Sequence, residues 1–285
     1  MEYKKRYEEW LNSSCVDEST KAELMAIADN DTEIKERFFC DLEFGTAGLR
    51  GVIGAGTNRI NRYVVRRTTK GYAEYIKKLG KEACERGVVI AHDNRRFSVA
   101  FAEETACVLA ANGIRAYLFD SLRPTPELSF AVRYLKALGG VVITASHNPP
   151  EYNGYKLYDE RGCQIVGEIS TNVIAEIAKI SDPLTVETVS REEAGDRIVV
   201  LDPSMDEAYY AAVMKVELQP DMDKDGLKIV YSPQHGTGNI PVRTVLDRLG
   251  YCVIPVEEQC PPDTEFSRTL NPNPEAEAAY VLSLE

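Results

Sequence analysis

Ser146 is the residue of this chain whose type and position are best suited to chemistry. It follows the β-branched run Val141–Ile143 and precedes His147, Asn148 and two prolines. Such a run predicts a short buried strand, which would place the serine at the strand's carboxyl end. Open α/β sheets bind their ligands at that edge. A hydroxyl there could act as a nucleophile or carry a transferable group.

The familiar serine chemistries fit the surrounding residues poorly. A hydrolase nucleophile elbow needs glycines two residues before and after the serine, and here those positions are Thr144 and Asn148. For a triad, only His92 and His235 are available besides the adjacent His147. No Gly-x-x-x-x-Gly-Lys-Ser/Thr sequence occurs. Neither hydrolysis nor P-loop nucleotide binding is well supported.

Phosphoryl transfer suits a serine that lacks an evident strong base. Its transition state is loose, so catalysis depends on positioning the groups and neutralising the phosphate oxygens. Arginine is well suited to this because it can contact phosphate oxygens in a bidentate manner. The cations predicted to lie in loops or at the ends of elements are Arg50, Arg95, Arg96, Arg123 and Lys156. These residues favour a small anionic substrate.

The elements that must position these residues alternate between strands and helices. Residues 44–61 contain five glycines and predict a shaped loop. Helices are expected over 61–79, with Asn61 as N-cap, over 98–112, with Ser98 as N-cap, and over 168–180. Strands are expected over 88–93, 114–119 and 141–143, and a hairpin-like pair over 153–166. This alternation predicts an α/β fold with a largely parallel sheet.

The layout repeats after a boundary expected between residues 182 and 202. The segment 227–256 again predicts strand, polar loop, helix, glycine and strand, as does 88–119. We therefore expect two similar domains, over 1–195 and 196–285, with the second incomplete. Within the second, DMDKDG at 221–226 resembles the start of a calcium loop, but Ser232 stands where a bidentate glutamate is needed. We interpret that segment as an exposed polar turn.

Composition limits the possible partners. The 285 residues carry a formal net charge of −12, which argues against nucleic acid. Seven scattered cysteines form no Cys-x-x-Cys pair, so neither a zinc site nor a disulfide framework is indicated and a reducing cytoplasm is expected. No window approaches the ~18 apolar residues of a membrane span. We expect a protein of the cytoplasm, monomeric or dimeric, without a membrane partner.

Several motifs together resemble those of one family. These are FGTAGLRG at 44–51, DNRRFS at 93–98, PTP at 124–126, TASHNP at 144–149 and NGYK at 153–156. In this order they are similar to the α-D-phosphohexomutases, that is, phosphoglucomutase and phosphomannomutase. The similarity is strong over residues 40–160, and HGTGN at 235–239 extends it weakly.

The resemblance implies a fold and a set of roles. The fold would be a three-layer α/β/α domain followed by part of a second, similar one. Ser146 would be the phosphoserine and, through its phosphate, one ligand of Mg²⁺. His147 would shape the loop, and Arg50 and Lys156 would lie near the transferred phosphate, with Lys156 as candidate general acid or base. The residues expected to bind substrate or phosphate, or to shape the backbone for it, are Thr46, Gly48, Arg95, Arg123 and Asn148.

The same resemblance implies an activity that needs more than these residues. The full protein would interconvert hexose 1-phosphate and hexose 6-phosphate through a bisphosphorylated sugar. The family's metal loop, sugar-reading loop and fourth-domain phosphate site are not found here, so we expect an N-terminal half that is inactive alone. The alternatives are a phosphopentomutase, a sugar-1,6-bisphosphate synthase, or a non-catalytic module that binds a phosphosugar.

Overall fold

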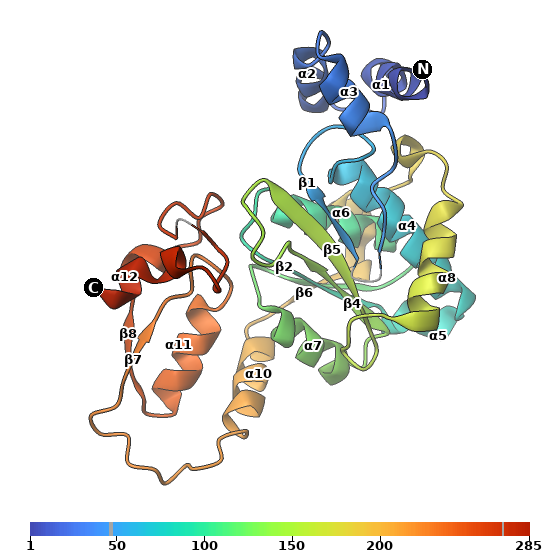
Figure 1. The fold of residues 1–285 in the computed structure, drawn as a ribbon. Helices are drawn as coiled ribbons and strands as arrows, with labels where there is room; N and C mark the ends of the chain where they lie inside the picture. The colour runs from blue at the N-terminus through green and yellow to red at the C-terminus, as the bar shows by residue number, and fades with distance from the viewer. Residues whose placement is uncertain (46–47, 270) are drawn as a thin grey trace.

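A six-stranded sheet organises the larger of two lobes in the computed structural model, which describes residues 1–45, 48–269 and 271–285 (Figure 1). The strand order is β1-β5-β4-β2-β3-β6. Strands β4, β2, β3 and β6 run parallel, whereas β5 is antiparallel to both β4 and β1. The bounds are Leu49–Val52 for β1, Val88–His92 for β2, Ala116–Phe119 for β3, Gly139–Ile143 for β4, Tyr152–Asp159 for β5 and Ile198–Leu201 for β6. The predicted mixed, largely parallel α/β sheet is confirmed.

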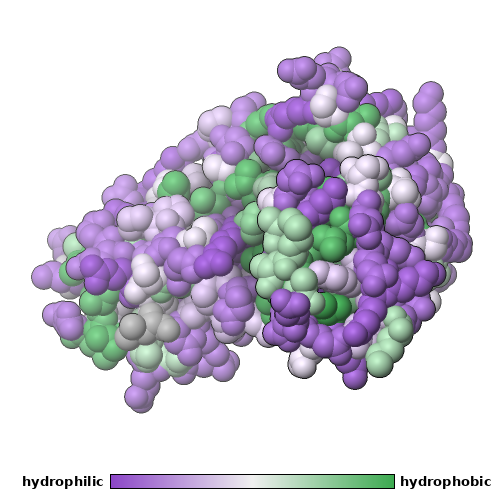
Figure 2. Space-filling model, turned by 90° about the horizontal axis from the view of Figure 1, so that it is seen from above, coloured by the Kyte–Doolittle hydropathy of each residue, from purple (hydrophilic) through white to green (hydrophobic). Residues whose placement is uncertain are grey.

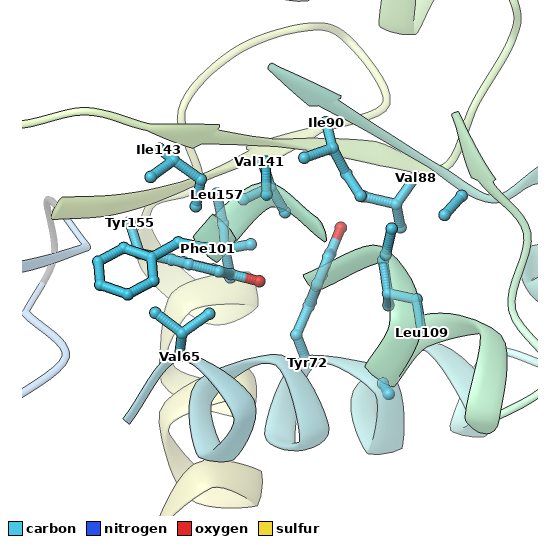
Figure 3. Close-up of a cluster of buried hydrophobic side chains, with 14 of the residues drawn as sticks. Val65, Tyr72, Val88, Ile90, Phe101, Leu109, Val141, Ile143, Tyr155 and Leu157 are labelled. Carbon is cyan, nitrogen blue, oxygen red and sulfur yellow. The ribbon is translucent and has the colours of Figure 1, made fainter. Parts of the chain in front are cut away.

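Helices cover both faces of this sheet and complete three layers. The helices α4 (Arg62–Lys78), α6 (Ser98–Ala111) and α8 (Gly167–Ala178) pack on one face, and α7 (Thr125–Tyr134) packs on the other. Two short helices, α5 (Lys81–Arg86) and α9 (Arg191–Ala194), lie in the connections. Figure 3 shows the core between the sheet and α4, where Tyr72 and Val65 point towards Val141 and Tyr155. The close packing of this apolar layer holds the strands in fixed positions. It thereby also positions the strand ends from which the polar loops extend.

Local sequence explains the main elements. In β2, the residues Val88, Val89 and Ile90 are fully buried, as expected for a central strand of a parallel sheet. Helix α4 begins after Asn61, whose Oδ1 accepts a hydrogen bond from the Val64 amide at 3.0 Å. The Asn61 cap predicted from sequence is therefore confirmed.

Three N-terminal helices form a separate layer at the amino-terminal end of α4. They are α1 (Glu2–Asn12), α2 (Glu18–Ala26) and α3 (Asp31–Phe38). Their core is aromatic: the Trp10 ring packs edge-on against Phe38 at a centroid distance of 5.7 Å and against Tyr63 of α4 at 5.2 Å. Tyr63 thus connects this layer to the main lobe.

The smaller lobe repeats the strand–helix–strand pattern. Its parallel strands β7 (Lys228–Tyr231) and β8 (Cys252–Pro255) flank α11 (Asn239–Arg248), in the way β2 and β3 flank α6. Helix α10 (Ser204–Met214) leads into this lobe, and the short α12 (Val281–Leu284) ends the chain. The expected boundary at 195/196 falls just before β6, which still pairs with the larger sheet. The division of the chain at that point stays a prediction.

The surface is mostly polar. Figure 2 shows hydrophilic residues over most of one face, with apolar side chains exposed in a few places, among them the outer end of the smaller lobe. Among the described residues, no helix combines the length and the apolar content that a bilayer crossing requires.

Candidate active site

Ser146 lies where the sequence predicted, just beyond the carboxyl end of β4. We call residues 144–152 the serine loop. Ser146 has φ of 58°, in the left-handed region that residues other than glycine rarely adopt. Its amide donates to Thr144 Oγ1 at 2.9 Å, and its exposed hydroxyl lies 3.2 Å from His147 Nδ1. The strained backbone thus presents the hydroxyl to solvent beside an imidazole.

Arg95 supports the serine loop from the protein interior. Its side chain is fully buried, and the two Nη atoms donate four hydrogen bonds to loop carbonyls. The remaining Nε faces Asp93 Oδ2 at 3.3 Å. Burial lowers the pKa of Arg95, and the negative charge of Asp93 opposes that shift. Arg95 contacts the loop backbone through every terminal N–H group.

Arg50 and Lys156 share one face of the sheet. Arg50 of β1 lies opposite Gly154 of β5, and Lys156, two residues further along β5, lies opposite Val142 of β4. Directly opposed residues and those two apart project to the same side of a sheet. Burial lowers the pKa of Lys156, and the charge of Arg50 lowers it further. This lysine can therefore lose its proton more readily than an exposed one.

Gly48 allows β1 to approach β5 closely. It has φ of 94°, and a Cβ at this position would lie 2.3 Å from the Tyr155 carbonyl oxygen. No side chain fits there, so Gly48 shapes the backbone. Thr46, also predicted for this loop, lies outside the described residues.

A pocket of about 400 Å³ separates the serine loop from the smaller lobe. Ser146 and His147 line it from one side, and Gln234 and Thr237 line it from the other. The first turn of α7 contributes Thr125. Its described lining includes neither Arg50 nor Lys156. The pocket therefore brings the predicted serine and histidine together with the HGTGN segment.

Two other predicted residues have different surroundings. Arg123 forms a bidentate pair with Asp206 of α10, with Nε···Oδ1 at 2.7 Å and Nη2···Oδ2 at 2.8 Å. It thus connects the turn before α7 to α10. Asn148 contributes its backbone, because its carbonyl accepts from Arg95 Nη2 at 2.6 Å. His235, in contrast, is buried, with Nδ1 bonded to the Pro261 carbonyl at 2.8 Å and Nε2 accepting from the Arg268 amide at 3.2 Å.

Three supporting residues were not singled out from sequence. Asp93 accepts from the Arg95 amide at 2.9 Å and from the Ser98 hydroxyl at 2.7 Å. Buried Asn153 donates to Ser98 Oγ at 3.0 Å. Thr144 bonds the Ser146 amide, as described above. All three lie within quoted motifs, so the motifs located them without showing what each one contacts.

The described residues around Ser146 do not form a complete Mg²⁺ site. Among residues 1–45, 48–269 and 271–285, no group of three or more His, Cys, Asp or Glu side chains is placed to hold a metal. Asp93, a carboxylate residue that lines the pocket, is occupied by Arg95 and Ser98. Mg²⁺ prefers several oxygen ligands in octahedral geometry. A phosphate on Ser146 would supply one of them, and this metal role stays a prediction.

Two family models match the chain in sequence order. The model described as phosphoglucomutase/phosphomannomutase, alpha/beta/alpha domain I, matches residues 41–183. The corresponding domain II model matches residues 207–285. The first match contains five of the six strands of the larger sheet, β1 to β5, together with α8, and the second contains the β7–α11–β8 unit.

Individual relatives agree with these models. A phosphoglucomutase from Staphylococcus epidermidis is 38% identical over 255 residues, which are 89% of this chain and 46% of that protein. A protein named probable phosphoribomutase from Schizosaccharomyces pombe is 35% identical over 286 aligned residues, 98% of this chain and 48% of that protein.

A solved structure also resembles the chain. It is assigned as a phosphomannomutase from Thermus thermophilus and has a TM-score of 0.70 at 31% identity, covering 86% of this chain and 51% of that one. The chain spans about half the length of the curated relatives it matches. The order of its two matched domains and its identity to these relatives show that the chain belongs to the phosphoglucomutase/phosphomannomutase family.

Proposed function

We propose that this chain carries the phosphoserine of a hexose phosphate mutase, with Ser146 as the phosphorylated residue. The observation that carries the proposal is the exposed Ser146 hydroxyl, placed beyond β4 with φ of 58° and held by a buried arginine. A loose phosphoryl-transfer transition state needs such positioning more than it needs a powerful base. Membership of the family supports the same assignment.

The proposed reaction consists of two transfers. In the first, the Ser146 Oγ–P bond breaks as a sugar hydroxyl oxygen bonds the phosphorus; the sugar hydroxyl proton passes to a base, and the freed Ser146 Oγ takes up a proton. A hexose bisphosphate results. In the second, Ser146 Oγ gives up its proton and bonds the phosphorus of the phosphoryl group at the other sugar position, the sugar O–P bond breaks, and the freed sugar oxygen takes a proton. The sugar leaves with its phosphate moved.

Lys156 and Arg50 suit the supporting roles. The pKa of Lys156 is lowered by burial and then by Arg50, so the lysine can accept a proton from the sugar hydroxyl and return it. Arg50 offers N–H donors to phosphate oxygens. His147, at 3.2 Å from the Ser146 hydroxyl, can orient that hydroxyl.

The relatives suggest two candidate sugars. The phosphoglucomutase relative favours glucose phosphate, and the relative named probable phosphoribomutase, which matches 98% of this chain, favours a pentose phosphate as second candidate. Isomerisation of glucose, mannose and ribose 1-phosphates by the longest natural form of the protein would distinguish them. Formation of a bisphosphate without isomerisation would indicate a bisphosphate synthase.

Phosphate mapping tests the central residue. The protein is incubated with a hexose 1,6-bisphosphate, and the peptides are analysed by mass spectrometry. We expect one phosphate on Ser146, none after Ser146→Ala, and unchanged labelling after Ser14→Ala, which alters another exposed serine. Binding of the sugar phosphate without any label would favour the non-catalytic module.

Residues 1–285 alone are proposed to turn over little or no sugar phosphate. The reason is that the family's metal loop and sugar-reading loop have no matching motif in this sequence. Sustained isomerisation by the purified 285-residue chain would contradict this. The cytoplasmic location, the oligomeric state and the absence of a nucleic-acid partner stay predictions.

A further inference from the structure

Arg95 uses all its terminal donors inside the protein. Nη1 donates to the carbonyls of Pro149 at 2.8 Å and Tyr152 at 3.0 Å. Nη2 donates to the carbonyls of Ser146 at 2.9 Å and Asn148 at 2.6 Å. Each Nη carries two N–H groups, so these four bonds exhaust them. The side chain therefore has no terminal donor left for a substrate phosphate.

The serine loop needs a buried cation of this shape. Its carbonyls point inwards at a stretch where the chain, up to the start of β5 at Tyr152, forms neither helix nor strand, and unpaired buried carbonyls are costly. Pro149 and Pro150 lack amide hydrogens, which leaves the loop few ways to pair within itself. A planar guanidinium can contact four carbonyls at once, whereas an ammonium group has only three donors.

The smaller lobe packs on the same guanidinium. Phe266 is buried and has a backbone φ of 53°. The centroid of its ring lies 5.1 Å from the Arg95 guanidinium carbon. On either side of Arg95, Asn94 Nδ2 donates to the Asp263 carbonyl at 2.8 Å, and Arg96 pairs with Glu265, with Nε···Oε1 at 2.6 Å. Figure 1 shows this segment, in the loop after β8, beside the loop that joins β4 and β5.

We propose that Arg95 is a positioning residue for phosphoryl transfer at Ser146, and that Phe266 of the smaller lobe keeps it in place by covering its outer face. The inference rests on the proposed function. Arg95 acts through the serine-loop backbone and touches neither substrate nor phosphate. The contact with residues 263–266 makes the orientation of the Ser146 hydroxyl depend on the position of the smaller lobe.

The test measures transfer and loop order in the same proteins. Arg95→Lys is introduced into the longest natural form of the protein. Lysine keeps the positive charge but cannot make four hydrogen bonds. We expect phosphorylation of Ser146 by hexose 1,6-bisphosphate to slow about 100-fold, the effect of a small misplacement of a reacting group. The KM for the bisphosphate should change less than about threefold, because Arg95 has no donor free for it. Hydrogen exchange should accelerate in the peptide that contains residues 144–152 and stay unchanged in the β2 and β3 peptides.

Two further variants separate positioning from general stability. Phe266→Leu keeps an apolar cover but removes the ring, and we expect about fivefold slower phosphorylation. Arg133→Lys changes an exposed arginine of α7 and should match the parent in every measurement. The positioning role would be overturned if Ser146 in Arg95→Lys were phosphorylated at the parent rate, or if its phosphorylation were slowed mainly through a change in KM.

The same measurements distinguish a failure of the proposed function from a failure of the positioning role. No phosphate on Ser146 in the parent protein would overturn the proposed function, and this inference with it. If the parent protein acquires phosphate on Ser146 and Arg95→Lys acquires it equally fast, the inference alone would be overturned. Faster exchange throughout the variant would likewise overturn it, because a general loss of stability would then explain the slower transfer.

Discussion

Glu127 should make the protein less stable as pH rises through neutrality. Its carboxyl group lies in the first turn of α7 and is 0% exposed. As a carboxylate it has no hydrogen-bond partner among the described residues, since Arg123, 3.9 Å away, is engaged by Asp206. When protonated, Glu127 can donate a hydrogen bond to the Asp206 carboxylate. Burial, followed by the hydrogen bond and the charge of Asp206, raises the pKa of Glu127 to about 8.

The sign of the effect follows from proton binding. Between the ordinary value of 4.5 and about 8, the folded protein keeps a proton on Glu127 that the unfolded chain has released. The free energy of unfolding therefore falls as pH rises through this window and levels off on both sides of it. At 1.36 kcal/mol per pKa unit, the upper limit is about 4 to 5 kcal/mol. Side-chain relaxation and water penetration should reduce the measured loss to roughly 2 kcal/mol.

The perturbation is Glu127→Gln, which resembles the protonated acid in shape and does not titrate. Urea unfolding followed by far-UV circular dichroism at a series of pH values from about 5 to about 8 gives the free energy of unfolding of both proteins. We expect the parent to lose about 2 kcal/mol more than the variant over this range. Glu103→Gln, an exposed carboxylate, should keep the parent's slope. Parallel curves for the parent and Glu127→Gln would refute the reasoning.

Three other substitutions test the supports of the site, each by urea unfolding. Asn61→Ala removes the α4 cap and two bonds to loop carbonyls and should cost about 2 kcal/mol, whereas Asn61→Asp should recover part of that as a cap alone. Gly154→Ala would place a Cβ 2.5 Å from a backbone oxygen of the serine loop and should cost about 3 kcal/mol, against about 1 kcal/mol for Gly80→Ala, where nothing lies within 4 Å. Tyr155→Phe removes the buried bond to Thr69 Oγ1 at 3.0 Å and should cost about 1 kcal/mol; no change in any of the three would contradict these contacts.

Local patterns predicted the elements well because neighbouring residues determine them. The β-branched runs became β2 and β4, and Asn61 caps α4 as expected. The Ser98 cap was wrong. Phe97, with φ of 63°, takes the N-cap position of α6, and the Ser98 hydroxyl donates to Asp93 instead. A serine has both options available locally, and only the fold around Asp93 decides between them.

The arginines show where sequence reasoning reaches its limit. Arg95 and Arg123 have the same guanidinium and similar loop positions, and both were predicted to bind substrate or phosphate. In the structure Arg95 reaches carbonyls more than 50 residues away along the chain, and Arg123 pairs with Asp206, 83 residues away. Their roles towards a substrate stay predictions. Such partners are brought together by tertiary packing, which no local pattern encodes. In contrast, the order of the sequence motifs was enough to locate Ser146, because a motif contains the residues on both sides of the serine.

The aromatic layer on α4 has a practical consequence. Trp10 is the only tryptophan in the sequence, and its indole is almost entirely buried between Phe38 and Tyr63. Its fluorescence emission should therefore be blue-shifted while α1 is seated on α4 and should move to longer wavelength when that helix detaches. Emission spectra would report detachment of the amino-terminal helices separately from melting of the sheet, without any added dye or engineered label.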